Sequence, residues 1–168
     1  MILDGAMGTM IQRYGLSEED YHSGPFKDCI KELNHFYRKN KALWENDRSW
    51  DGFEWLSADD HTRNLIAFVR RDKAGKELVF VVNFSTEAWE NYKLGVPAKG
   101  VYTEVFNTDE ARWGGSGVIN TGEIKPVWKS VHGKECSVTL RIPPLGALML
   151  QGKGRLAKEK KKDGGKRK

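Results

Sequence analysis

The sequence is poor in cysteine and contains no long apolar run. Cys29 and Cys136 are the only two cysteines among 168 residues, and they lie far apart. Two isolated thiols suit a reducing compartment and have no metal-ligand spacing. No apolar stretch approaches the roughly 20 residues that a membrane helix needs, and the first residues show no basic region followed by an apolar one. We therefore expect a cytoplasmic protein with no signal peptide, membrane span, metal or cofactor.

The residue patterns of common catalytic sites are also missing. A glycosidase needs two carboxylates about 5–9 Å apart in a cleft. The close acidic pairs, which include Asp59–Asp60 and Asp109–Glu110, stand in turn-like polar stretches, where solvated carboxylates are the ordinary outcome. The four histidines show no spacing of a metal site or a catalytic triad. We predict no catalytic residues.

Dense β patterns are what the sequence does contain. Two runs rich in Val, Ile, Leu and Phe flank a turn that holds Gly75, which is typical of an antiparallel hairpin. The whole pattern predicts a mainly β fold, an antiparallel β-sandwich of about eight strands. The expected strands are residues 53–56, 65–69, 78–84, 92–95, 101–107, 124–131, 136–142 and 147–151.

An amphipathic helix is predicted before the sandwich. Pro25 suits the first helical position, and apolar residues follow at helical spacings of three and four. We expect the apolar stripe to pack on the sandwich, and the alternative is that part of it contacts a surface outside this chain. The stripe consists of Phe26, Cys29, Ile30, Leu33, Phe36 and Tyr37.

The tryptophans give a hint of a binding surface. Trp55 alternates with apolar neighbours and is expected in the core, whereas Trp44 and Trp50 are expected to seal the helix onto the sandwich. Trp89 stands in a polar stretch, and Trp113 precedes the glycine-rich residues 114–117, which we expect to form a flexible loop. An exposed indole can support a sugar ring through the ring's axial C–H bonds. The ordinary alternative is that each of these two side chains caps a hydrophobic edge.

The positive charge is concentrated at the C-terminus. Residues 151–168 carry nine basic and two acidic side chains, a net +7, so the other 150 residues carry −2 out of the total of +5. We expect residues 152–168 to form a disordered basic tail. We expect no nucleic-acid partner except through non-specific phosphate contacts of this tail, and the ordinary alternative is a solubilising end without a partner.

Several short motifs between residues 21 and 150 occur in the order and spacing of one enzyme family. They include KELNHFYR at 31–38, GFEWL at 52–56, FVRR at 68–71, FNTD at 106–109 and GGSG at 114–117. In these motifs the chain resembles the C-terminal region of bacterial 1,4-α-glucan (glycogen) branching enzymes. The resemblance implies that the helix is the last one of a catalytic (β/α)₈ barrel and that the strands form the C-terminal domain found in α-amylase relatives. It also implies that the catalytic carboxylates lie upstream, at positions that this sequence lacks.

The N-terminus resembles a different protein family. The run DGAMGT at residues 4–9 is similar to the opening of the homocysteine-binding barrel of cobalamin-dependent methionine synthases. That family uses three cysteines to bind zinc and a barrel needs about 250 residues, so methyltransferase chemistry is excluded. We expect a foreign segment at 1–20, a helical segment at 21–46, the sandwich at 47–151 and the tail at 152–168.

Three functions remain open on the sequence. The first is a module without catalytic activity that binds α-glucan weakly through Trp89 or Trp113 and supports a separate barrel. Such a barrel would be contacted through Phe26, Ile30, Leu33 and Tyr37. The second is a purely structural fragment or one subunit of a split enzyme, and the third is a polyanion binder that acts through the basic tail.

Overall fold

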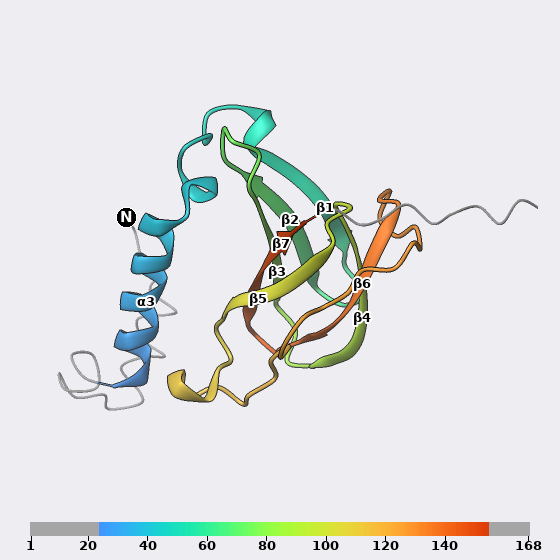
Figure 1. The fold of residues 1–168 in the computed structure, drawn as a ribbon. Coiled ribbons are helices and arrows are strands. Elements are labelled where there is room, and N and C mark those ends of the chain that lie inside the picture. Colours follow the sequence, from blue (N-terminus) through green and yellow to red (C-terminus); the bar gives the residue numbers. More distant parts are fainter. Residues whose placement is uncertain (1–23, 155–168) are drawn as a thin grey trace, which may run out of the picture.

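The structure is a computed structural model that describes residues 24–154 (Figure 1). The predicted segment 1–20 and nearly all of the predicted tail lie outside these residues. The described chain begins with helix α3 (Pro25–Lys39), followed by the short 3₁₀ helices η1 (Lys41–Leu43) and η2 (Trp50–Gly52). Seven strands follow, with a third 3₁₀ helix, η3 (Ala111–Trp113), between the fifth and the sixth.

The strands form two antiparallel sheets. The larger sheet has five strands in the order β1-β2-β3-β7-β5, and the smaller sheet pairs β4 with β6. This arrangement confirms the predicted fold class, a mainly β antiparallel sandwich preceded by an amphipathic helix. The strands are β1 (Phe53–Asp60), β2 (Leu65–Arg71), β3 (Glu77–Asn83), β4 (Trp89–Val96), β5 (Val101–Asn107), β6 (Cys136–Ile142) and β7 (Ala147–Lys153).

The predicted hairpin is confirmed as β2 and β3. The two strands pair without interruption from Leu65 opposite Asn83 to Arg71 opposite Glu77. Asp72 closes the turn, because its side chain accepts a hydrogen bond from the Lys76 amide at 2.8 Å. Gly75 has a φ of +77°, a conformation that glycine adopts without strain.

The predicted strand at 124–131 is wrong, so residues 24–154 form seven strands where eight were expected. Ile124, Val127 and Val131 form isolated bridges to three different places, namely Tyr102, Ser137 and Lys134. Because the three partners are not consecutive, no continuous ladder forms, and Pro126 has no amide hydrogen to add to one. The segment is therefore an extended loop over the edge of the sandwich.

The main core lies between the two sheets. Alternate residues of each strand point inward, as predicted for Val138, Leu140 and Ile142 of β6, which are all buried. From the larger sheet, β3 contributes Val79 and Val81 to the same cluster. These side chains exclude water from both sheets at once and hold them together.

A second cluster lies on the outer face of the larger sheet. Five side chains stand opposite one another across all five strands, and we call them the outer row: Trp55, Phe68, Phe80, Met149 and Phe106. Neighbouring rings are in contact, with centroids 5.8 Å apart for Trp55 and Phe68 and 4.8 Å apart for Phe68 and Phe80. The outer row therefore gives this sheet a second apolar face.

Helix α3 covers one end of the outer row. It lies beside the five-stranded sheet, on the side away from β4 and β6 (Figure 1). Cys29, Leu33 and Phe36 belong to the apolar cluster around the outer row, which we call the outer cluster. The Phe36 ring lies 5.8 Å from that of Phe106. At the other end of the row Trp55 is 49% exposed. The prediction of a core Trp55 is wrong, because Trp55 pairs opposite Phe68 on the outer face of the sheet, and the inward side chains at this point of β1 are Leu56 and Ser57.

Candidate functional site

A hollow of about 490 Å³ opens beside the start of β4. Its walls come from three separate parts of the sequence: the turn between β1 and β2, strand β4, and the turn before β6. We call it the Trp89 hollow, and it is lined by Arg63, Trp89, Asn91, Tyr92, Lys93 and His132. The volume lies in the range of pockets that hold small ligands.

Ion pairing fixes Arg63 at the hollow. Its Nη1 donates to both carboxylate oxygens of Asp60, at 3.2 and 3.0 Å. The guanidinium lies 5.8 Å from the centre of the Trp89 ring and 5.9 Å from the centre of the Tyr92 ring. At these distances the cation is attracted by the electron-rich faces of both rings. Arg63 thus holds the two aromatic side chains of β4 in one arrangement.

Burial and Asp60 set the charges around the hollow. Burial, together with the nearby Asp60 carboxylate, raises the pKa of Tyr92 to about 12, and the phenol donates to Asp60 at 3.2 Å. Burial acts to raise the pKa of Asp60, but hydrogen bonds from Arg63 and Thr62 outweigh it and keep this pKa below the usual value. Burial lowers the pKa of His132, which favours the neutral form of its ring. The Arg63 charge is balanced by Asp60, and the hollow keeps the positive charge of Lys93.

The structure places the two predicted glucan-binding tryptophans apart. Trp89 is the first residue of β4 rather than part of a loop, and one side of its half-buried ring packs on the main core. Trp113 belongs to η3, where its indole N–H donates to the Asn107 carbonyl at 3.1 Å. The Trp113 ring packs on Phe106 and carries the Arg112 guanidinium 3.9 Å from its centre. The glucan-binding role of both stays a prediction, and Trp89 is the one that lines a hollow.

The apolar stripe of α3 is divided between two surfaces. Leu33 packs against the outer cluster together with Cys29 and Phe36. The side chains of Phe26, Ile30 and Tyr37 are 71%, 40% and 47% exposed. Of the residues predicted to contact a separate barrel, three therefore present free apolar surface and Leu33 faces the sandwich.

Comparison with known proteins identifies this architecture. Residues 55–153 match the model of the family described as "Alpha amylase, C-terminal all-beta domain". The chain belongs to this family. It is 38% identical over 144 residues to the 1,4-alpha-glucan branching enzyme GlgB of Prochlorococcus marinus (strain NATL1A), which is 85% of this chain and 19% of the relative.

Two further relatives carry the same name. The branching enzyme GlgB of Bacillus mycoides (strain KBAB4) is 34% identical over 175 residues, which is all of this chain and 27% of that protein. The GlgB of Francisella philomiragia subsp. philomiragia is 41% identical over 135 residues, 79% of this chain and 21% of that protein. The chain thus spans about a fifth to a quarter of the length of these relatives, and what it shares with them is the C-terminal domain.

One member of each acidic pair, Asp60 or Asp109, has a structural role. Asp59 and Asp60 are the last two residues of strand β1, whereas the sequence had suggested a turn-like stretch. Asp109 is 8% exposed and accepts hydrogen bonds from the Ser116 amide, the Ser116 hydroxyl and the Val118 amide at 2.8, 2.7 and 2.8 Å. The prediction of a solvated Asp109 is wrong, because the amide groups of the glycine-rich loop surround its carboxylate and replace water.

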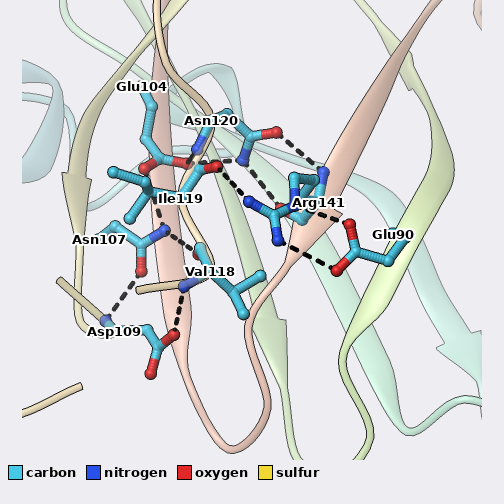
Figure 2. Close-up of polar contacts among 8 residues, drawn as sticks. All are labelled: Glu90, Glu104, Asn107, Asp109, Val118, Ile119, Asn120 and Arg141. Atoms are coloured by element: carbon cyan, nitrogen blue, oxygen red, sulfur yellow. Dashed lines mark hydrogen bonds and ion pairs between the residues drawn. The ribbon is translucent and has the colours of Figure 1, made fainter. Parts of the chain in front are cut away.

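The loop after Asp109 also links the two sheets of the domain (Figure 2). Asn120 donates to Glu104 of β5 at 2.7 Å and to the Arg141 carbonyl of β6 at 2.8 Å. Arg141 in turn donates to both carboxylate oxygens of Glu90 on β4, at 2.7 and 3.1 Å. These contacts join the larger sheet to the smaller one through a loop that has no regular secondary structure.

Between residues 24 and 154, no group of three or more His, Cys, Asp or Glu side chains is placed to hold a metal ion. Over the same residues, no helix has the length and apolar character needed to cross a membrane.

Proposed function

We propose that this chain is the C-terminal domain of a 1,4-alpha-glucan branching enzyme, that it packs on the catalytic barrel of that enzyme, and that it forms no branches by itself. The observation that carries the proposal is the apolar surface left open at both sides of the outer row. A folded domain of this size rarely exposes so many large apolar side chains unless they face a partner.

The first part of this surface is the free side of α3. Phe26, Ile30 and Tyr37 lie at helical spacings of four and seven residues and so share one face of the helix. The neighbouring edge of the same stripe is already buried on the sandwich. The helix is therefore apolar around a sector wide enough for two contacts, one to the sandwich and one to a surface outside residues 24–154.

The second part is the uncovered end of the outer row. Trp55 is half exposed there, and Phe53 packs edge-on against it with ring centroids 4.9 Å apart. Trp50 is 84% exposed and Trp44 is 41% exposed, so the prediction that these two seal α3 onto the sandwich is wrong. Aromatic side chains that the domain itself leaves uncovered are typical of the centre of a domain interface.

The size of the relatives supports a large partner domain. About three quarters or more of each relative lies outside the matched region, which leaves ample chain for a barrel of about 250 residues. Several acidic residues of the matched region are engaged in ion pairs or hydrogen bonds within the sandwich, among them Asp60, Glu77, Glu90 and Asp109. This distribution of roles favours catalysis by the partner domain and support by this one.

A chimeric enzyme tests the proposal. In the Bacillus mycoides enzyme, the C-terminal region is replaced by residues 24–154 of this chain, and branching of amylose is measured from the chain-length profile after debranching. We expect the chimera to form branches and the 168-residue chain alone to form none. We further expect Ile30→Glu to lower the activity of the chimera at least tenfold, because it places a charge in the apolar contact.

The matched control is His35→Glu, which adds the same side chain to the opposite, exposed face of α3. We expect it to change the activity less than twofold. New α-1,6 linkages made by the chain alone would contradict the absence of catalysis. Equal effects of Ile30→Glu and His35→Glu would contradict the proposed contact surface.

A further inference from the structure

We propose that the Trp89 hollow is a carbohydrate-binding site that holds a short stretch of α-1,4-linked glucan. The lining of the hollow by itself fits a neutral pyranose. The choice of α-1,4-linked glucan among neutral sugar chains rests on the proposed function. Neither the family match nor the names of the relatives assign a role to these six residues.

The first argument is the combination of side chains. Trp89, Tyr92 and His132 bring three rings to one hollow, and the rings of Tyr92 and His132 lie 6.2 Å apart. A pyranose presents a face of C–H bonds, which packs on such rings, and a rim of hydroxyl groups, which needs hydrogen-bonding partners. Arg63, Asn91 and Lys93 supply these partners around the rings, and the side chains of Asn91 and Lys93 are exposed.

The second argument is charge. Asp60 pairs with Arg63 at 3.0 Å, and burial lowers the pKa of His132, which favours its uncharged form. Lys93 is then the one charged side chain of the lining for which no ion pair occurs among residues 24–154. A site for phosphate or another anion normally gathers several unpaired cations. A single lysine among rings and amides fits a neutral ligand better.

The third argument is rigidity. Trp89 and Tyr92 belong to a strand whose inner side is packed in the main core, and Arg63 is held by two hydrogen bonds to Asp60. Little side-chain freedom is lost when a ligand binds to such a surface, which favours affinity. The affinity is still expected to be weak, with a dissociation constant of roughly 1 mM, because a shallow hollow with one main ring platform makes few contacts.

The test measures retardation of the full 168-residue chain in gels that contain glycogen, together with titration of the chain with maltoheptaose. We expect retardation in glycogen and saturable binding of maltoheptaose. Trp89→Ala should weaken binding at least tenfold. Trp89→Phe should retain binding within about threefold, because it keeps a ring at the platform.

Trp89→Phe also shows whether Trp89→Ala loses binding because the ring is missing or only because the chain unfolds. The Trp89 indole N–H is buried and has no hydrogen-bond partner within residues 24–154, so its removal leaves no acceptor unsatisfied. Thermal unfolding of each variant is recorded alongside binding. Trp50→Ala is the matched control, since Trp50 is far more exposed but does not line the hollow. It should bind like the unchanged chain.

Three results would overturn the proposal: no retardation of the unchanged chain, an equal loss in Trp50→Ala and Trp89→Ala, or saturable binding of inorganic phosphate in place of maltoheptaose. Cellohexaose serves as a further ligand, and equal binding of both oligosaccharides would overturn the choice of α-1,4-glucan. The assay needs no barrel, so its failure is distinguishable from failure of the chimera. A chain that binds glucan while the chimera is inactive would contradict the proposed function alone.

Discussion

Replacing Asp109 with alanine is expected to lower the free energy of unfolding by about 2–4 kcal/mol, because it removes three hydrogen bonds to a buried charged group. The Ser116 and Val118 amides would lose their acceptor in a region where water does not replace it easily. Gly115 lies so close to the Asp109 backbone that a Cβ built on it would be 2.3 Å away. The loop can fold this tightly only around the Asp109 carboxylate, so the loss should be cooperative. Urea unfolding at pH 7 measures it.

The same substitution should loosen helix α3. Trp113, at the end of η3, packs on Phe106 of the outer row, and η3 contacts α3 directly. Once the loop is released, Trp113 loses its fixed place beside the end of the row that α3 covers. We expect faster hydrogen exchange in α3 of the Asp109→Ala chain. The control is Glu110→Ala, which removes an ion pair with the half-exposed Arg112 and should cost less than about 1 kcal/mol.

The stabilisation by Asp109 should depend on pH. Burial acts to raise the pKa of this carboxyl, but the hydrogen bonds from Ser116, Val118 and Gly117 outweigh burial and hold it below the usual value. A carboxyl whose pKa is lower in the folded than in the unfolded chain stabilises the fold above the unfolded pKa of about 4. The stabilisation is lost as the pH falls below that value. The difference in unfolding free energy between the unchanged chain and Asp109→Ala should therefore shrink between pH 5 and pH 3, and a difference that grows would contradict the assignment.

Local sequence patterns predicted the elements that are determined by residues close together in the chain. The β2–β3 hairpin follows from two dense apolar runs and a short turn with Gly75, and α3 follows from apolar residues at helical spacing after Pro25. In both, the information that determines the structure lies within about 20 residues. The failed strand at 124–131 has an extended conformation, as predicted, but its partners are dispersed along the chain. Residue pattern alone does not reveal whether a ladder partner exists.

The tryptophans show a second limit. Alternation placed Trp55 in an apolar strand correctly, but the face of the sheet that it occupies depends on its pairing opposite Phe68 of β2. Trp89 was expected in a loop because its neighbours are polar, although Glu90 and Asn91 are exposed residues of β4. The prediction of a possible sugar platform could still be made from the residue type. The direction in which each ring points could not be predicted from the residue type.

The lining of the Trp89 hollow was the least predictable feature. Asn91, Tyr92 and Lys93 lie two to four residues after Trp89 and could have been proposed from the strand pattern, but Arg63 and His132 are 26 and 43 residues away from Trp89 in the sequence. Nothing near either residue signals a common site. They meet because β1, β4 and the turn before β6 adjoin in the folded sandwich, which is a consequence of the topology.

Replacing Gly95 with alanine is expected to lower the free energy of unfolding by about 3 kcal/mol and to remove the Trp89 hollow. A Cβ built on Gly95 would lie 1.9 Å from the Val131 carbonyl oxygen and 3.3 Å from the Cβ of His132. The closest clash is with backbone, so no side-chain rotation relieves it, and either β4 or the turn that carries His132 must move. Overpacking of this kind typically costs 1–3 kcal/mol and sometimes more.

The position of Gly95 links this cost to function, because the Gly95 amide also donates to the His132 ring at 3.4 Å. A displaced turn would take His132 away from Tyr92 and open one wall of the hollow. We therefore expect Gly95→Ala to lower the melting temperature by about 10 °C and to lose retardation in glycogen at a temperature where the chain is still folded. Thr139→Ala on the paired strand β6 is the control, since Thr139 is exposed and opposite Lys93, and it should change both measurements little. A Gly95→Ala chain as stable as this control would contradict the close approach of residues 131 and 132 to β4.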